Sequence, residues 1–231
     1  MANPVANLIS VPLQNNFDYG IGSNNGSKYT INLQPVIPIA LSPKLNLVTR
    51  YILPIVFQRD VTGDKTAEDG LGDLTISAYF APANANLIWG VGPIILVPTG
   101  TNDFLGAKKW GLGPSVLALK QSNGITYGFL ANQTWSVAGD KQRDDVSLLY
   151  VQPFLAYNWK SGAGVSANSE ITQNWMTEST IVFLNFSVSG VTKLGGQMVS
   201  LSIGPKIPIA SPAASKPDFG LRASLTFVFP K

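Results

Sequence analysis

The 231-residue sequence contains no cysteine and no histidine, and only 13% of its residues are charged. Without cysteine the chain has no disulfide, no iron–sulfur cluster and no thiol nucleophile. Without histidine it lacks the commonest general base and the usual ligands of catalytic zinc. Its acidic segment 60–73 does not have the spacing of a calcium loop, so we expect no metal and no cofactor. The net charge of +3 is small and scattered, so nucleic acid is not an expected partner.

A long hydrophobic run is also absent, although 45% of the residues are hydrophobic. The longest segment without charge, from Leu74 to Asn102, is interrupted by prolines, glycines and asparagines. No segment supplies the roughly 20 apolar residues that a membrane-spanning helix requires. A chain so apolar and so poor in charge is not expected to be disordered. Its short segments, punctuated by glycine and proline, favour β-structure, either a soluble sandwich or a barrel in a membrane.

Alternation of polar and apolar residues with a period of two favours the barrel. In the last segment Leu221, Leu225 and Phe229 share one face, whereas Arg222 and Thr226 lie on the other. Each segment has about the 9–11 residues that cross a bilayer as a β-strand. The segments are 15–22, 29–39, 45–58, 73–81, 87–98, 109–120, 125–137, 147–159, 165–175, 180–189, 197–209 and 221–229. Alternation is poor in two of them, 87–98 and 109–120.

The connections between these segments alternate between short turns and longer or more charged loops. The short ones are 42–44, 82–86, 121–124, 160–164 and 190–196; the others are 22–27, 59–72, 99–108, 138–146, 176–179 and 210–218. Outer-membrane barrels have this asymmetry. All 5 tryptophans also lie near expected strand ends, as two interfacial aromatic girdles require. The sequence therefore predicts an all-β fold, a transmembrane antiparallel barrel of twelve strands with both chain ends on the periplasmic side.

The first thirteen residues differ from the rest, because they are apolar, uncharged and broken by Pro4 and Pro12. We expect residues 1–13 to fold into the lumen as a plug and residues 14–231 to form the barrel. The plug residues would be Asn3, Val5, Asn7, Leu8, Ile9, Val11 and Leu13. A disordered tail and an extension of the first strand are the alternatives. Because no secretory signal peptide is visible, Met1 is interpreted as an added start on a mature, exported chain.

The wetter faces of the strands are expected to line the lumen. The candidate pore-lining residues are Arg50, Arg222, Lys206, Glu170, Asn32, Gln34, Gln152, Asn168, Tyr150 and Phe154. A lining of aromatic rings and amides suits a small amphipathic or aromatic molecule better than a bare ion. The alternative is that the charges pair across the lumen and the aromatic rings only fill it. A barrel of this size is expected to have a narrow lumen, between filled eight-stranded barrels and open sixteen-stranded porins.

Five prolines fall in outward register within the expected strands, and each follows glutamine or glycine. They are Pro35, Pro93, Pro114, Pro153 and Pro205. Proline donates no hydrogen bond to the ladder and is normally kept out of sheet interiors. One interpretation is a set of β-bulges that give the wall its curvature. The other is a local weakness through which an apolar solute leaves sideways into the bilayer.

Several short motifs resemble those of a known family. They are Asn3-Pro4-Val5-Ala6-Asn7-Leu8-Ile9-Ser10-Val11-Pro12, Gln14-Asn15-Asn16, Gln34-Pro35-Val36-Ile37-Pro38, Trp89-Gly90-Val91-Gly92-Pro93, Lys109-Trp110-Gly111-Leu112-Gly113-Pro114, Asn132-Gln133-Thr134-Trp135-Ser136-Val137-Ala138-Gly139 and Phe227-Val228-Phe229-Pro230-Lys231. With these motifs the sequence resembles a family of Gram-negative outer-membrane channels labelled as phenol-degradation (MetA-type) pathway proteins. The last motif is similar to the signal read by the barrel-assembly machinery, although two residues follow Phe229.

Together these observations predict a passive channel of the bacterial outer membrane for small, hydrophobic or aromatic molecules, with a lumen occluded by the N-terminal segment. The alternative is a non-conducting structural barrel. An enzyme is not expected, because Glu170 is the only inward glutamate in the middle of the wall and no second carboxylate is evident beside it. The expected partners are small-molecule solutes, outer-membrane lipids and, during biogenesis, the barrel-assembly machinery. No segment marks a broad contact between copies, so a monomer is expected.

Overall fold

The structure, a computed structural model, describes residues 8–83 and 87–230 and consists almost entirely of β-strands. One short 3₁₀ turn, η1, covers Ala213–Ser215. The strands are β1 (Leu8–Ile21), β2 (Gly26–Leu33), β3 (Val36–Ser42), β4 (Leu45–Arg59), β5 (Ala67–Leu71), β6 (Leu74–Pro82), β7 (Ile88–Val97), β8 (Lys109–Ser122), β9 (Ile125–Gly139), β10 (Ser147–Asn158), β11 (Gly164–Asn174), β12 (Ser179–Leu194), β13 (Gln197–Ala210) and β14 (Phe219–Pro230). Within the described residues, no helix has the length and hydropathy needed to cross a membrane.

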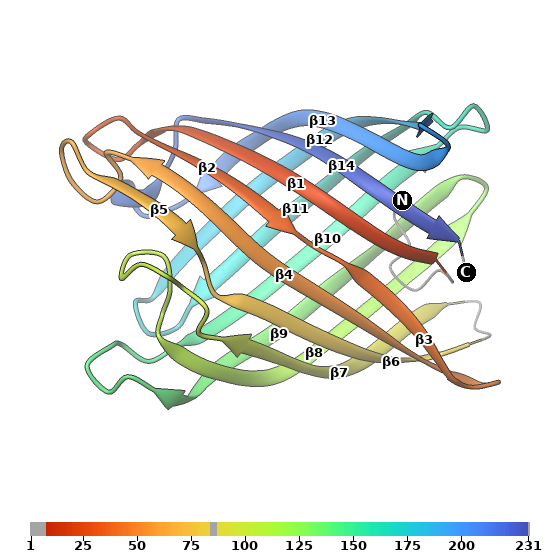
Figure 1. Ribbon diagram of the computed structural model, residues 1–231, viewed down its shortest axis with the longest axis horizontal. Coiled ribbons are helices and arrows are strands. Elements are labelled where there is room, and N and C mark those ends of the chain that lie inside the picture. The colour runs from red at the N-terminus through yellow and green to blue at the C-terminus, as the bar shows by residue number, and fades with distance from the viewer. Residues whose placement is uncertain (1–7, 84–86, 231) are drawn as a thin grey trace.

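The strands form one closed antiparallel barrel (Figure 1). It closes where β14 pairs with β1, from Leu8↔Pro230 to Tyr19↔Phe219. Both β2 and β3 pair with β4 on one side, and both β5 and β6 pair with it on the other. Each of these two couples is therefore a single wall strand with a short interruption, so the 14 strands make the 12 wall strands that the sequence predicted.

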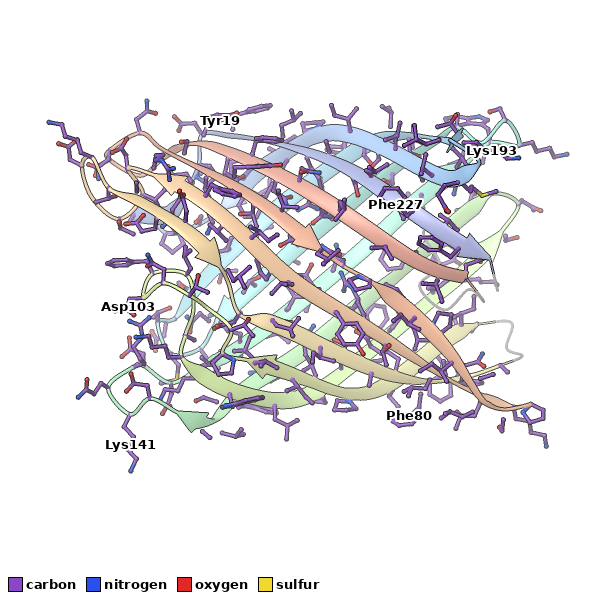
Figure 2. The ribbon with its side chains drawn as sticks, in the orientation of Figure 1. Tyr19, Phe80, Asp103, Lys141, Lys193 and Phe227 are labelled. Atoms are coloured by element: carbon purple, nitrogen blue, oxygen red, sulfur yellow. The ribbon has the colours of Figure 1, made fainter. Side chains whose placement is uncertain are left out.

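Apolar side chains cover the outer face of the barrel, as the period-two pattern predicted. Tyr19, Phe80 and Phe227 project outward in Figure 2. The five tryptophans are 42–52% exposed and lie close to strand ends. One outward polar side chain, Asn15, is satisfied locally, because the Tyr29 hydroxyl donates a 2.6 Å hydrogen bond to its Oδ1 atom. An apolar outer surface of this kind is stable when the hydrocarbon of a membrane, and not water, covers it.

The two ends of the barrel differ, as expected. The first and last described residues, Leu8 and Pro230, and the short turns lie at one end, and the longer loops lie at the other (Figure 1). Hydrogen bonds hold the loop between β7 and β8 against Asp73, which lies between β5 and β6, and against the loop between β9 and β10. The Asp73 carboxylate accepts hydrogen bonds from the backbone N–H groups of Gly100 and Ala107. Arg143, in the loop between β9 and β10, donates to the carbonyl oxygens of Asp103 and Gly106.

The first strand begins earlier than the sequence suggested. Residues 8–13, including the expected plug residues Leu8, Ile9, Val11 and Leu13, belong to β1 and pair with β14. The boundary between plug and barrel at residues 13 and 14 was therefore wrong for this part of the chain. Pro12 is tolerated because the ladder between β1 and β2 is interrupted beside it, and its carbonyl accepts a hydrogen bond from the Gln34 N–H. Asn3, Val5 and Asn7 lie outside the described residues.

The prolines in outward register interrupt the ladder, but not through bulges. Pro93 faces Ala78, and the pairs on either side, Ser77↔Ile94 and Phe80↔Val91, keep the same register. The same loss of two residue pairs without a change of register occurs beside Pro35, Pro114, Pro153 and Pro205. The expectation of bulges was therefore wrong. From β6 to β13, every second junction between neighbouring strands carries one such interruption.

Close backbone approach explains why glycine precedes three of these prolines. A Cβ added to Gly92, Gly113 or Gly204 would collide with the carbonyl oxygen of the neighbouring strand. That carbonyl belongs to the residue opposite the proline. Because proline has no backbone N–H, the carbonyl receives no ladder hydrogen bond from it. The carbonyl oxygen lies 1.7–1.9 Å from the position of the added Cβ, so only a glycine hydrogen fits there, a geometry in which a weak Cα–H···O contact is expected. The strands therefore stay in contact at these three interruptions.

Candidate functional site in the barrel lumen

A cavity of about 330 Å³ lies inside the barrel and has two chemically different sides. Lumen-facing side chains of β11–β14 and β1 are mostly hydroxyls and amides. Those of β3, β4, β6, β8 and β9 are mostly apolar. The polar side includes Ser10, Gln14, Ser166, Asn168, Asn185, Ser187, Ser200, Ser202, Arg222 and Ser224, and the apolar side includes Val36, Val48, Tyr79, Leu117 and Leu130.

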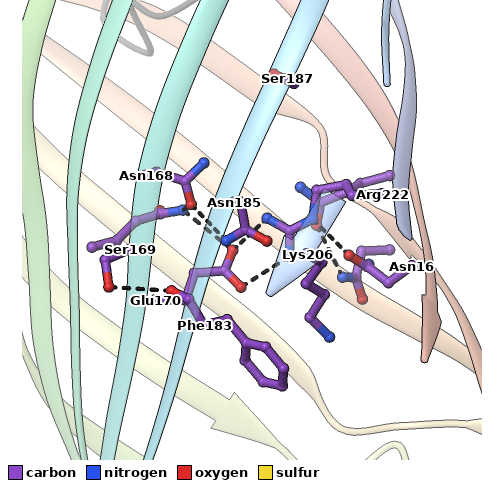
Figure 3. A network of polar contacts seen from close by, with 12 residues as sticks. Asn16, Asn168, Ser169, Glu170, Phe183, Asn185, Ser187, Lys206 and Arg222 are labelled. Atoms are coloured by element: carbon purple, nitrogen blue, oxygen red, sulfur yellow. Dashed lines mark hydrogen bonds and ion pairs between the residues drawn. The ribbon is translucent and has the colours of Figure 1, made fainter. Parts of the chain in front are cut away.

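An ion pair between Arg222 of β14 and Glu170 of β11 forms the centre of the polar side (Figure 3). The two guanidinium nitrogens donate to the two carboxylate oxygens at 2.7 and 2.9 Å. The Nε atom of Arg222 donates to Asn16 of β1 at 2.7 Å, and Gln152 of β10 donates to Glu170 at 3.4 Å. Because β12 and β13 separate β11 from β14, this pair reaches across part of the lumen and narrows it.

A second ion pair lies between Lys206 of β13 and Asp18 of β1. The Lys206 ammonium donates to both oxygens of Asp18, at 2.8 and 2.7 Å, and both side chains are about 90% buried. The same ammonium lies 3.9 Å from the centre of the Phe183 ring, a cation–π contact. We call these side chains the polar network: Asn16, Asp18, Gln152, Asn168, Glu170, Asn185, Lys206 and Arg222. Within the described chain, the Asn185 Oδ1 atom is the one buried side-chain acceptor without a hydrogen-bond partner.

A row of amides connects β1 to Arg50. Gln34 donates to Gln14 at 3.2 Å, and Asn32 donates to the same oxygen at 3.3 Å. Arg50 of β4 then donates to Gln34 at 3.2 Å. No ion pair of the described residues involves Arg50, in contrast to Lys206 and Arg222.

The apolar side of the lumen is a compact hydrophobic core, which we call the apolar cluster. Its members are Val36, Val48, Tyr79, Leu117, Leu119 and Leu130, with Ile88, Tyr150 and Phe154 packed against them. All six members are 7% exposed or less. The buried Tyr79 hydroxyl has a hydrogen-bond partner, because the Ser115 hydroxyl donates to it at 2.9 Å. The part of the lumen that the cluster occupies is therefore filled with side chains.

The structure places the predicted pore-lining residues in two groups. Gln34, Arg50, Gln152, Phe154, Asn168 and Arg222 line the cavity. Lys206 and Glu170 lie in the polar network, Asn32 is bonded to Gln14, and Tyr150 packs against the apolar cluster. Whether they line a conducting path stays a prediction. Among the residues that the structure describes, no group of acidic side chains is placed to hold a metal.

Sequence reasoning missed most of the apolar cluster and, in the polar network, Asn16 and Asp18; Asn185 was placed on a wetter strand face but was not among the candidate pore-lining residues. Leu117 and Leu119 lie in a segment whose alternation was poor, and that irregularity was itself the signal. A strand that is apolar in both registers is covered on both faces, here by lipid outside and by the cluster inside. Asn16 and Asp18 were missed because the inward register of the first strand was not assigned.

The fold is shared with a solved outer membrane channel. The chain is similar to the COG4313 outer membrane channel from Pseudomonas putida F1, with a TM-score of 0.74 and 14% identity over 96% of this chain and 95% of that chain. At this identity the similarity shows the fold alone. The low-pH structure of Pseudomonas putida OprB covers 96% of this chain and 91% of its own with 8% identity, but its TM-score of 0.34 is too low to indicate a shared fold.

The sequence matches no protein-family model, and no curated protein matches it. The phenol-degradation label of the resembling family therefore receives no support from these comparisons.

Proposed function

We propose that the protein is a passive channel of the bacterial outer membrane that admits small, apolar or aromatic molecules. The observation that carries this proposal is the cavity of about 330 Å³ inside a closed barrel, with hydroxyls and amides on one side and apolar side chains on the other. A closed barrel satisfies its backbone within lipid, and this one is apolar outside. Its fold is also that of a solved outer membrane channel.

The lining favours small solutes with both apolar and polar groups. Ligand sites of roughly 300–1,000 Å³ are typically apolar with a few placed polar groups, and this cavity has that composition. The margin of the apolar cluster, including Phe154, offers contact to a ring or a short chain, while the serine-rich side of the cavity offers hydrogen bonds. The chain is proposed to act as a monomer, with solutes and outer-membrane lipids as its partners.

Conductance of the purified protein in planar lipid bilayers tests the proposal. Discrete single-channel steps are expected, and their absence from a correctly folded sample would favour a non-conducting structural barrel. If the polar network limits the passage, the double variant Glu170→Gln/Arg222→Gln should raise the conductance. A matched control is Asp103→Asn/Lys108→Gln, which removes an exposed ion pair of a loop and should leave the conductance unchanged.

The plug hypothesis now concerns only residues 1–7, and its test changes accordingly. Removing residues 2–12 would delete part of β1 and its pairing with β14, so a change in conductance would not report on a plug. Removing residues 2–6 leaves every described strand intact. A higher conductance of this variant would support occlusion of the lumen, and an equal conductance would refute it.

The route by which a solute leaves the barrel has two candidates. The first is the end of the barrel that carries the short turns. The second is a lateral path through the interrupted ladders, but the close contact of Gly92 and Gly113 with neighbouring carbonyls favours a closed wall there. Pro93→Ala and Pro114→Ala restore an N–H at two interruptions. Unchanged uptake of an apolar solute by these variants would remove the support for the lateral path.

A further inference from the structure

Arg50 differs from the other arginine in the lumen. Arg222 has a carboxylate partner, whereas no carboxylate of the described residues pairs with Arg50. In the part of the chain that the structure describes, the Arg50 side chain makes one hydrogen bond, which goes to the neutral amide oxygen of Gln34. A guanidinium has five N–H donors, and Arg50 lines the cavity, so donors of this side chain are available to a ligand there.

Two buried apolar side chains lie next to Arg50 on the inner face of the wall. Its partner residues in the register of the wall are Val36 of β3 and Ser77 of β6, and Val48 precedes it by two positions on the same face. Val36 is 7% exposed and Val48 is 1% exposed, and both belong to the apolar cluster. Arg50 is therefore a cation at the margin of a hydrophobic core.

This juxtaposition is complementary to one kind of small molecule. A cation away from bulk water is stabilised by an anion, and a guanidinium matches the two oxygens of a carboxylate. The neighbouring wall of the cavity is apolar, and Phe154, which lines the cavity and is only partly buried, offers an aromatic contact. A molecule of this kind has one carboxylate attached directly to a ring or a short hydrocarbon group.

Resting on the proposed channel function, we propose that the lumen binds small apolar monocarboxylates. Arg50 holds the carboxylate, and the margin of the apolar cluster, where the less buried Phe154 lines the cavity, contacts the hydrocarbon body. Arg222 is the weaker site for an anion, because Glu170 neutralises its charge and three of its five N–H groups donate to Glu170 and Asn16. The cavity volume of about 330 Å³ admits a molecule with a single ring.

Block of the single-channel current by three matched probes tests this inference. Benzoate carries the charge and the ring, benzamide carries the ring without the charge, and acetate carries the charge without the ring. Benzoate is expected to interrupt the current at a concentration about tenfold or more below that needed for either other probe. Equal potency of benzamide would overturn the role of the carboxylate. Equal potency of acetate would overturn the role of the apolar cluster.

Substitution of Arg50 assigns the site. In Arg50→Gln, the half-blocking concentration of benzoate should rise about tenfold or more, toward that of benzamide, and Arg50→Lys should restore part of the loss. The matched control is Arg59→Gln, which removes the same group from an exposed ion pair with Asp69 and should leave the block unchanged. If Arg50→Gln and Arg59→Gln behave alike, the assignment to Arg50 is wrong.

A binding measurement separates this inference from the proposed channel. Titration calorimetry with benzoate is performed on the protein in zwitterionic detergent, with empty micelles and Arg50→Gln as references. Binding to a protein that shows no conductance would keep the site and reject the channel. Conductance without binding above the Arg50→Gln level would keep the channel and reject the site.

Discussion

The two sides of the lumen are held together by different forces. On the side of β10–β14 and β1, charged and amide groups form directed bonds, and the Arg222–Glu170 and Lys206–Asp18 pairs fix their partners at 2.7–2.9 Å. On the side of β3–β9, side chains such as Leu117 and Val48 pack without direction at 1% exposure. The polar network depends on each member having its partner, whereas the apolar cluster depends on filled volume. Substitutions on the two sides should therefore fail in different ways.

The largest effect is expected from removing one partner of the Arg222–Glu170 pair. Glu170→Leu leaves a buried guanidinium without its carboxylate and should lower the free energy of unfolding by about 3–5 kcal/mol. The double variant Glu170→Leu/Arg222→Leu should recover most of this loss, because two packed apolar groups replace a desolvated ion pair. Urea unfolding in detergent micelles, followed by tryptophan fluorescence, measures both. If the double variant is as unstable as the single one, the network is not held by paired charge.

A slightly smaller effect is expected on the apolar side. Leu117→Ala removes volume from the apolar cluster and should cost about 2–5 kcal/mol, without any recovery by a second charge substitution. The control is Leu201→Ala on the outer face, where the side chain is 50% exposed and detergent replaces the lost contact. Its cost should stay below that of Leu117→Ala in the same urea titration. Equal costs would show that the cluster is loosely packed.

The interrupted ladders lie in both sides of the wall and should respond equally. Gly113→Ala on the apolar side and Gly204→Ala on the polar side each place a methyl group against a carbonyl, with an expected cost of about 1–3 kcal/mol. Gly190→Ala is the control, because no atom lies within 4 Å of the position of its added Cβ. A neutral Gly113→Ala combined with a costly Gly204→Ala would show that the two sides differ in backbone rigidity as well as in chemistry.

The smallest effect is expected at the loops, outside both sides of the lumen. A hydrogen bond from Lys108 lowers the pKa of Asp103, and hydrogen bonds from Lys109 and then Ser136 lower the pKa of Asp145. Since both folded pKa values lie below the reference value of 3.8, these contacts stabilise the loops above that pH and are lost as the pH falls through the folded pKa values. Amide exchange of residues 140–146, corrected for its intrinsic pH dependence, should therefore accelerate only in that acidic range. Asp145→Asn should remove part of this pH dependence.

Much of the wall could be predicted from the sequence because lipid and lumen impose a period of two. The facing of Leu221, Arg222 and Phe229 follows directly from it, as does the placement of the tryptophans near strand ends. Alternation also runs through Ile9, Ser10 and Val11, but Pro12 was given more weight than that pattern. A proline is compatible with a wall strand when its nitrogen faces a gap in the ladder, and this gap is a property of two strands together.

The candidate site was less predictable, because it depends on which side chains meet across the barrel. Arg222 and Glu170 are separated by 52 positions in the chain, and Lys206 and Asp18 by 188. Periodicity could place each of the first pair on the inner face but could not pair them. The contrast between a paired Arg222 and a carboxylate-free Arg50 is likewise a result of strand number and register, which no local pattern encodes.

The pairing of β1 with β14 joins the two ends of the described chain, so that Asn15 reaches the carbonyl of Ala223 across 208 positions. Until the last strand arrives, both margins of the growing sheet present bare N–H and C=O groups to any other extended chain. Closure must also await contacts with the longest possible separation along the polypeptide, which slows folding. The barrel is therefore exposed to aggregation throughout its assembly, and this exposure ends only when β14 pairs with β1.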